Sequence, residues 1–103
     1  MIADFKLFKS INEGEPEIGD WVLCGEESSD DEISIFVLNN VGQYIKNDNN
    51  SYYPYVIYYY NVPKNLYDFF RNNERNMKLS EIQYCSKNKE YLEQIIKTRK
   101  FNL

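Results

Sequence analysis

Few residues in this chain could carry chemistry. It contains no histidine, so it lacks the commonest general base and the commonest metal ligand. Triads of the Ser-His-Asp or Cys-His kind are therefore impossible within the chain. The two cysteines, Cys24 and Cys85, lack the spacing of a zinc site, and the four glycines lie too far apart to form a phosphate-binding loop. Composition thus predicts a protein that is not an enzyme and that needs no metal or cofactor.

The acidic run after Gly25 is the first candidate for a functional segment. Its five carboxylates belong to Glu26, Glu27, Asp30, Asp31 and Glu32. No apolar residue interrupts the run, so we expect a solvated surface loop. Two other interpretations stay open, namely contact with a basic partner and imitation of the nucleic-acid backbone. Composition alone also leaves carboxylate-pair chemistry open, whereas the spacing is wrong for a calcium loop.

The second candidate is a tyrosine-rich strand, which is expected between Tyr52 and Tyr60. Six of these nine residues are tyrosine. Alternation in a strand divides the segment into two faces. We take Val56 as the residue that marks the core, so Val56 and Tyr58 are predicted to point inward. The outer, partner-binding face is then predicted to hold Tyr53, Tyr55, Ile57 and Tyr59.

Three interpretations of this outer face are possible. The C-terminal helix could cover the tyrosines, since its apolar stripe needs a partner. The face could instead bind a protein, because tyrosine is common in interaction hot spots. Stacking of single-stranded nucleic acid is the third interpretation. Trp21, which stands next to Val22 and therefore points to the opposite strand face, is either a second layer of core or an exposed anchor for a partner.

Length and charge limit the possible classes of protein. The 103 residues are predicted to form one domain spanning 1–103. Residues 1–40 carry a net charge of −8 and residues 41–103 one of +4. This distribution argues against direct nucleic-acid binding, which normally uses a basic stripe. We find no apolar run typical of a signal peptide or a membrane span and expect two free thiols, so the prediction is a cytoplasmic protein without membrane contact.

These segments must be positioned by a small set of elements. Strands are predicted at 18–24 and 41–46, and an Asn-rich turn at 47–51 predicts a hairpin from Gly42 to Tyr60. A short helix is expected at 64–72, a brief strand near 77–79, and a C-terminal helix at about 86–99 with Ser86 as its N-cap. The predicted class is α+β, with a small, strongly bent antiparallel sheet of the SH3-like barrel type.

The order of five segments resembles small uncharacterised SH3-like proteins of AT-rich viral and mobile-element genomes. These segments are Ile18-Gly19-Asp20-Trp21-Val22, Asn39-Asn40-Val41-Gly42-Gln43, Tyr53-Pro54-Tyr55-Val56, Asn61-Val62-Pro63 and Ser86-Lys87-Asn88-Lys89-Glu90-Tyr91-Leu92-Glu93. Asn, Ile, Lys and Tyr together supply 42 of the 103 residues, as an AT-rich gene would produce. The resemblance implies a fold and an origin, and it transfers no catalytic residue.

The sequence therefore predicts a non-enzymatic protein-interaction module. Its binding surface would combine Trp21 and the tyrosine-rich face with the acidic loop, and its protein partner is unidentified. One alternative is a virus-encoded or mobile-element-encoded inhibitor that blocks a host defence nuclease by imitating nucleic acid. Another is a self-assembling viral structural protein, a homo-oligomer joined through the tyrosine strand.

Overall fold

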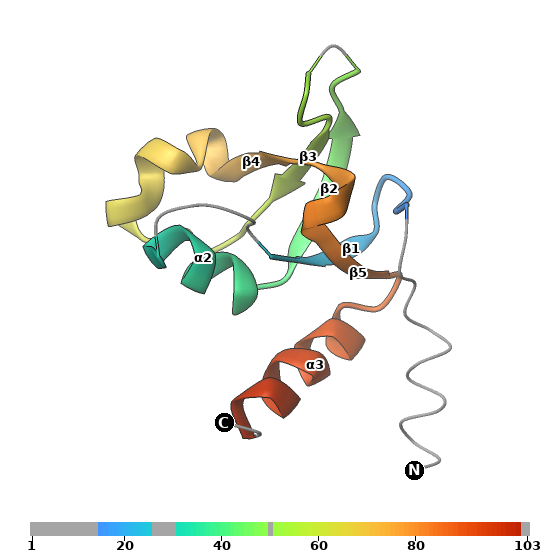
Figure 1. Cartoon of the computed structure of the whole chain (residues 1–103), viewed down its shortest axis with the longest axis vertical. Coiled ribbons are helices and arrows are strands. Elements are labelled where there is room, and N and C mark those ends of the chain that lie inside the picture. The colour runs from blue at the N-terminus through green and yellow to red at the C-terminus, as the bar shows by residue number, and fades with distance from the viewer. Residues whose placement is uncertain (1–14, 26–30, 50, 102–103) are drawn as a thin grey trace.

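A five-stranded antiparallel sheet forms the centre of the molecule (Figure 1). The computed structural model describes residues 15–25, 31–49 and 51–101. The strands are β1 (Trp21–Cys24), β2 (Gly42–Asn47), β3 (Tyr55–Tyr58), β4 (Glu74–Met77) and β5 (Ile82–Ser86). The helices are α2 (Asp31–Leu38) and α3 (Lys89–Phe101), and the short 3-10 helices are η1 (Lys64–Phe69), η2 (Arg71–Asn73) and η3 (Leu79–Glu81).

The strand order is β4-β3-β2-β1-β5. Strands β1 to β4 form a meander in which each strand pairs with its neighbour along the chain, and β5 then returns to the opposite edge and pairs with β1. In the described part of the chain, β4 and β5 remain edges, so the sheet does not close on itself. The predicted α+β class, with an antiparallel sheet and a C-terminal helix, is confirmed at this level.

The predicted hairpin is also confirmed, because β2 and β3 pair on either side of the Asn-rich turn. The turn is closed by main-chain hydrogen bonds, one of which runs from the Asp48 amide to the Pro54 carbonyl at 2.7 Å. Gly42 opens the hairpin at a point where a side chain would clash, since a Cβ there would overlap Ile57 and come within 2.9 Å of the Tyr59 ring. This close approach explains why glycine stands at the first residue of β2.

One side of the sheet, which we call the inner face, carries the larger part of the core. Its strand residues are Val22, Cys24, Tyr44, Tyr55, Ile57, Met77, Ile82 and Cys85. Helix α2 and the η1 segment lie together against this face (Figure 1). Phe36 from α2 packs edge-on against Tyr59 and Phe70, with ring centroids 5.5 and 5.2 Å apart. Edge-to-face aromatic packing of this kind stabilises a core beyond simple area burial.

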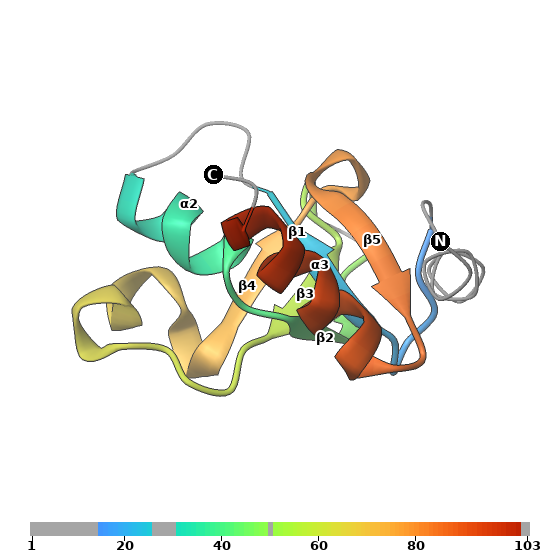
Figure 2. The ribbon, with the colours of Figure 1, turned by 90° about the horizontal axis from the view of Figure 1, so that it is seen from below.

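The opposite side, which we call the outer face, is only partly covered. Helix α3 packs Leu92 and Ile96 against Leu23 and Val41, so that it lies over β1 and β5. Figure 2 shows α3 crossing the sheet from the end of β5. The expected C-terminal helix thus finds a partner for its apolar stripe, but that partner is not the tyrosine strand β3.

Four local predictions are corrected by the structure. Asp31 and Glu32 begin α2 rather than lying in a loop, because Ile33, Phe36 and Val37 form an apolar stripe at helical spacing. Carboxylates are also favourable in a first helical turn. The expected strand at 77–79 is displaced to β4. The expected helix at 64–72 is replaced by the two 3-10 helices η1 and η2, the second of which is kinked at Asn72, whose φ is 55°.

The start of the C-terminal helix is the fourth correction. Ser86 ends β5 instead of capping the helix, because its neighbour Cys85 pairs opposite Val22 in the core. Asn88 takes the capping role, and its Oδ1 accepts a hydrogen bond from the Glu90 amide at 2.9 Å. Strand β5 was therefore missed, since the sequence predicted no element between 79 and 86 and assigned Ser86 to the start of the helix.

Substitution of two adjacent tyrosines, one buried and one exposed, is expected to change the stability of the fold by very different amounts. Tyr59 is 1% exposed and Tyr60 is 52% exposed. We expect Tyr59→Ser to lower the free energy of unfolding by about 3 to 5 kcal/mol, because it empties a large core site, or to prevent folding. Tyr60→Ser, the matched control, is expected to cost about 1 kcal/mol or less. Urea unfolding followed by circular dichroism measures both, and equal losses would show that the faces are assigned wrongly.

Candidate functional site

Strand pairing aligns a row of side chains across the outer face. Trp21 of β1 stands opposite Gln43 of β2, which stands opposite Tyr58 of β3, which stands opposite Glu74 of β4. Directly paired residues in antiparallel strands point to the same side of a sheet. The register therefore brings a tryptophan, an amide and a tyrosine together from three strands.

Tyr60 completes an aromatic cluster, which we define as Trp21, Tyr58 and Tyr60. Its ring centroid lies 5.0 Å from that of Tyr58, edge to face, and 6.0 Å from that of Trp21. The Tyr60 hydroxyl donates to Gln43 Oε1 at 3.4 Å. Such a cluster has large rigid apolar bodies with polar tips, which suits contact with another protein.

Lys89, in the first turn of α3, lies over this cluster. Its Nζ is 5.2 Å from the Trp21 ring centroid and 5.5 Å from that of Tyr60. A cation over an aromatic face is attracted by the ring quadrupole. The ammonium group thus makes cation–π contacts with two members of the cluster, and it gives this part of the outer face a positive charge.

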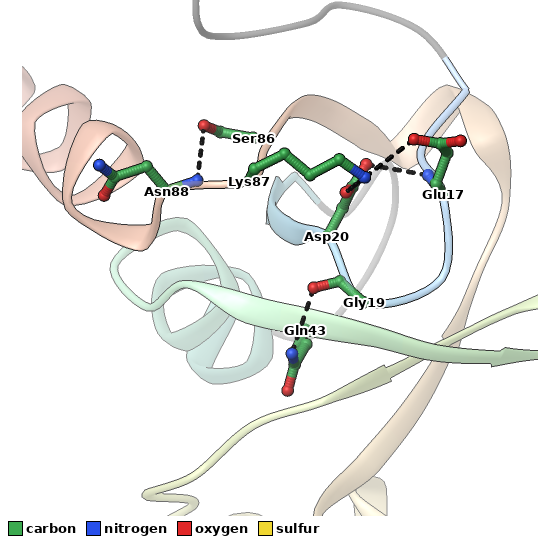
Figure 3. A network of polar contacts seen from close by, with 7 residues as sticks. All are labelled: Glu17, Gly19, Asp20, Gln43, Ser86, Lys87 and Asn88. Atoms are coloured by element: carbon green, nitrogen blue, oxygen red, sulfur yellow. Dashed lines mark hydrogen bonds and ion pairs between the residues drawn. The ribbon is translucent and has the colours of Figure 1, made fainter.

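A polar network joins the segment that precedes Trp21 to the connection between β5 and α3 (Figure 3). The Asp20 side chain is 5% exposed, and its Oδ1 lies 2.5 Å from Lys87 Nζ. Its Oδ2 accepts a hydrogen bond from the Glu17 amide at 2.9 Å, and Lys87 also pairs with the Glu17 carboxylate at 2.8 Å. Gly19 turns the chain into β1 with a φ of 100°, a conformation that favours glycine.

These contacts shift two pKa values. Hydrogen bonds to Asp20 and Glu17 raise the pKa of Lys87 above its ordinary range. Burial, reinforced by the nearby Asp20 charge, raises the pKa of the Cys85 thiol. Cys24 and Cys85 are both buried, and they form no disulfide. A buried thiol with a raised pKa is a poor nucleophile.

Three of the four residues that were predicted for the outer face of the tyrosine-rich strand belong to the inner face instead. Tyr55, Ile57 and Tyr59 are all less than 10% exposed and belong to the inner face. The division into two alternating sets was correct, but Val56 misled the choice between them, since it is buried on the other face. Burial and a hydrogen bond to Glu15 raise the pKa of Tyr55. What covers this set is α2 with the η1 segment, and not α3.

The remaining predicted site residues are not gathered at the aromatic cluster. Tyr53 is exposed beside Tyr52 in the β2–β3 connection, where Lys78 Nζ lies 5.5 Å from each ring centroid. Glu26, Glu27 and Asp30 lie outside the described residues. Asp31 starts α2, and Glu32 accepts a hydrogen bond from the Asn65 side chain at 3.4 Å. Only Trp21, among the predicted set, lies in the cluster.

Sequence reasoning missed Tyr58, Tyr60, Gln43 and Lys89. Tyr58 was predicted to point inward with Val56, and Tyr60 shares their strand parity, so neither was offered as a binding residue. Gln43 and Lys89 join the cluster through strand register and through the corner between β5 and α3, which no local motif encodes. The Asn-Val-Pro segment that follows Tyr60 was the available signal, because it ends the strand there and leaves Tyr60 at its exposed margin.

Neither a metal site nor a membrane span is found in the described ranges. Within them, no group of three or more potential ligands among Asp, Glu and Cys could hold a metal ion. No helix there is long and apolar enough to cross a membrane. Comparisons of the chain with protein-family models, with curated proteins and with solved structures found no match.

The ion pair between Asp20 and Lys87 predicts an alkaline dependence of stability. A raised pKa in the folded chain means that protonated Lys87 stabilises the fold, fully below the ordinary lysine value of 10.5 and progressively less at higher pH. We expect Lys87→Met to be less stable than the parent chain at pH 7, with a difference that shrinks above pH 10.5.

Urea unfolding at several pH values measures this difference. Lys64→Met is a suitable control, because Lys64 is also an exposed lysine but lies in η1. Its stability should follow that of the parent chain at every pH. A Lys87→Met difference that stayed constant from pH 7 to the alkaline limit would contradict the assignment of the ion pair.

Proposed function

We propose that this chain is a non-enzymatic protein-interaction module whose partner binds the aromatic cluster on the outer face. The observation that carries the proposal is the contact between Trp21, Tyr58 and Tyr60 at a place that α3 leaves partly uncovered. Tyr60 is 52% exposed although it packs against both other rings. The main core on the inner face does not include these three residues.

Physical reasons support a protein as the ligand. Tryptophan and tyrosine are enriched at interaction hot spots because they bury much area while losing little rotamer freedom. Gln43 and the hydroxyl groups supply polar contacts at the edge of the cluster. Direct nucleic-acid binding is less suitable, since the whole chain has a net charge of −4 and Glu74 adjoins Tyr58 in the row.

We further propose that the sheet has an SH3-like arrangement, as in the small viral and mobile-element proteins that the sequence resembles. The four-strand meander, the return of β5 to β1 and the 3-10 helix η3 between β4 and β5 support this. A cytoplasmic location accords with two buried cysteines that remain thiols. Inhibition of a host nuclease by acidic mimicry would depend mainly on Glu26, Glu27 and Asp30, and it has no support from the described part of the chain.

The test compares two tyrosines of equal exposure. Tyr60 and Tyr67 are each 52% exposed, and Tyr67 lies in η1, away from the cluster. We expect Tyr60→Ser to weaken partner binding by at least about tenfold, as loss of a hot-spot aromatic does. Tyr67→Ser should bind as the parent chain does.

Binding is measured by retention of cellular proteins on each immobilised variant, quantified by mass spectrometry. Partners are the proteins that the parent chain and Tyr67→Ser retain equally. Sedimentation of the same three chains tests self-assembly, in which case Tyr60→Ser would yield monomers from an oligomer. If Tyr60→Ser keeps every partner and every oligomer while its melting temperature is unchanged, the proposed surface is wrong.

A further inference from the structure

We infer that a pocket beside the aromatic cluster receives an acidic side chain of the protein partner, an inference that rests on the function proposed above. The pocket has a volume of about 330 Å³ and lies between the end of α2, the segment after β3 and one side of α3. Its lining includes Asn40, Tyr60, Asn61, Lys89, Glu93 and Lys97. Tyr60, a member of the aromatic cluster, and Lys89, which lies over that cluster, therefore also line this pocket.

The size of the pocket limits what it can hold. Sites for small molecules and cofactors usually have volumes of about 300 to 1,000 Å³. A pocket of about 330 Å³ is at the lower end, which suits one or two side chains of a peptide better than a cofactor. Because Tyr60 forms part of its wall, a peptide that contacts the aromatic cluster can place a neighbouring side chain in the pocket.

The charges of α3 indicate the chemistry of that side chain. Lys89, Glu93 and Lys97 follow one another at intervals of four residues, so they project from one side of the helix. The ion pairs of the described residues involve neither Glu93 nor Lys97. Two ammonium groups and one carboxylate give the pocket a positive balance, opposite in sign to the chain's net charge of −4.

The end of α2 does not cancel this positive balance. A helix C-terminus carries partial negative charge on its last carbonyl groups. Here the Ile35 and Phe36 carbonyls accept hydrogen bonds from the side-chain amides of Asn39 and Asn40, at 2.7 and 2.8 Å. Arg99 donates to the Leu38 carbonyl at 3.4 Å and so joins α3 to the end of α2.

Glu93 makes the inference testable in both directions. If the pocket takes a carboxylate, Lys97 attracts it and Glu93 repels it. Lys97→Gln should then weaken binding roughly 2- to 5-fold, and Glu93→Gln should strengthen it by a similar factor, as expected for exposed charge pairs. Lys64→Gln, an exposed lysine of η1 that does not line the pocket, should change nothing.

The probes are three pools of seven-residue synthetic peptides. Every peptide carries a central Trp, Tyr or Leu, and the flanking positions hold acidic residues in the first pool, Asn and Gln in the second, and Lys and Arg in the third. Titration into the isotope-labelled full chain, followed through backbone amide resonances, reports both affinity and location. We expect the acidic pool to bind most tightly and to shift the resonances of Asn61 and of Lys89 to Lys97.

Each outcome separates this inference from the proposed function. Tighter binding of the basic pool, weakening by Glu93→Gln, or shifts confined to other segments would overturn the acidic-peptide inference. If Tyr60→Ser abolishes binding of all pools while Lys97→Gln and Glu93→Gln have no effect, the aromatic surface stands and the acidic pocket fails. If neither Tyr60→Ser nor the charge variants change the binding of any pool, both proposals fail.

Discussion

The arrangement of this protein depends on the ion pair between the buried carboxylate of Asp20 and the ammonium group of Lys87. The Asp20 carbonyl accepts from the Tyr44 amide at 2.9 Å and so ties this residue to β2, while its side chain pairs with Lys87 at the end of β5. Lys87 stands between β5 and α3, so the same carboxylate holds the corner from which the C-terminal helix departs. A carboxylate this deeply buried requires such partners, because an unpaired charge away from water is costly.

The position of α3 then determines what the outer face offers. Once the corner is fixed, Leu92 and Ile96 cover β1 and β5, and Lys89 comes to lie over Trp21 and Tyr60. The helix does not extend over Tyr58, so the aromatic cluster is formed by the sheet, tied to the helix by one lysine, and left partly uncovered. We propose that binding uses this boundary, where an aromatic surface and the basic side of α3 meet.

Local signals predicted the parts of the fold that depend on short-range chemistry. The hairpin follows from the Asn-rich turn, and the start of β1 follows from the Gly19-Asp20 turn. The division of β3 into two alternating sets was also predictable, but the choice of face was not, because Val56 and Ile57 belong to different sets and both are buried. Likewise, β5 depends on pairing with a segment far away along the chain, as in the pair of Trp21 with Ser86, and the cluster around Tyr60 depends on the register between β1, β2 and β3.

Nitration of tyrosine by tetranitromethane, read residue by residue in the folded chain by mass spectrometry, tests the central claim that the exposed aromatic surface is the Tyr60 side of the sheet. The account predicts rapid nitration of Tyr60, Tyr52 and Tyr67, which are 52%, 79% and 52% exposed. It predicts protection of Tyr55 and Tyr59, which are 7% and 1% exposed, until the chain is unfolded in urea. Nitration of Tyr55 and Tyr59 as fast as that of Tyr52, with Tyr60 protected, would contradict the account.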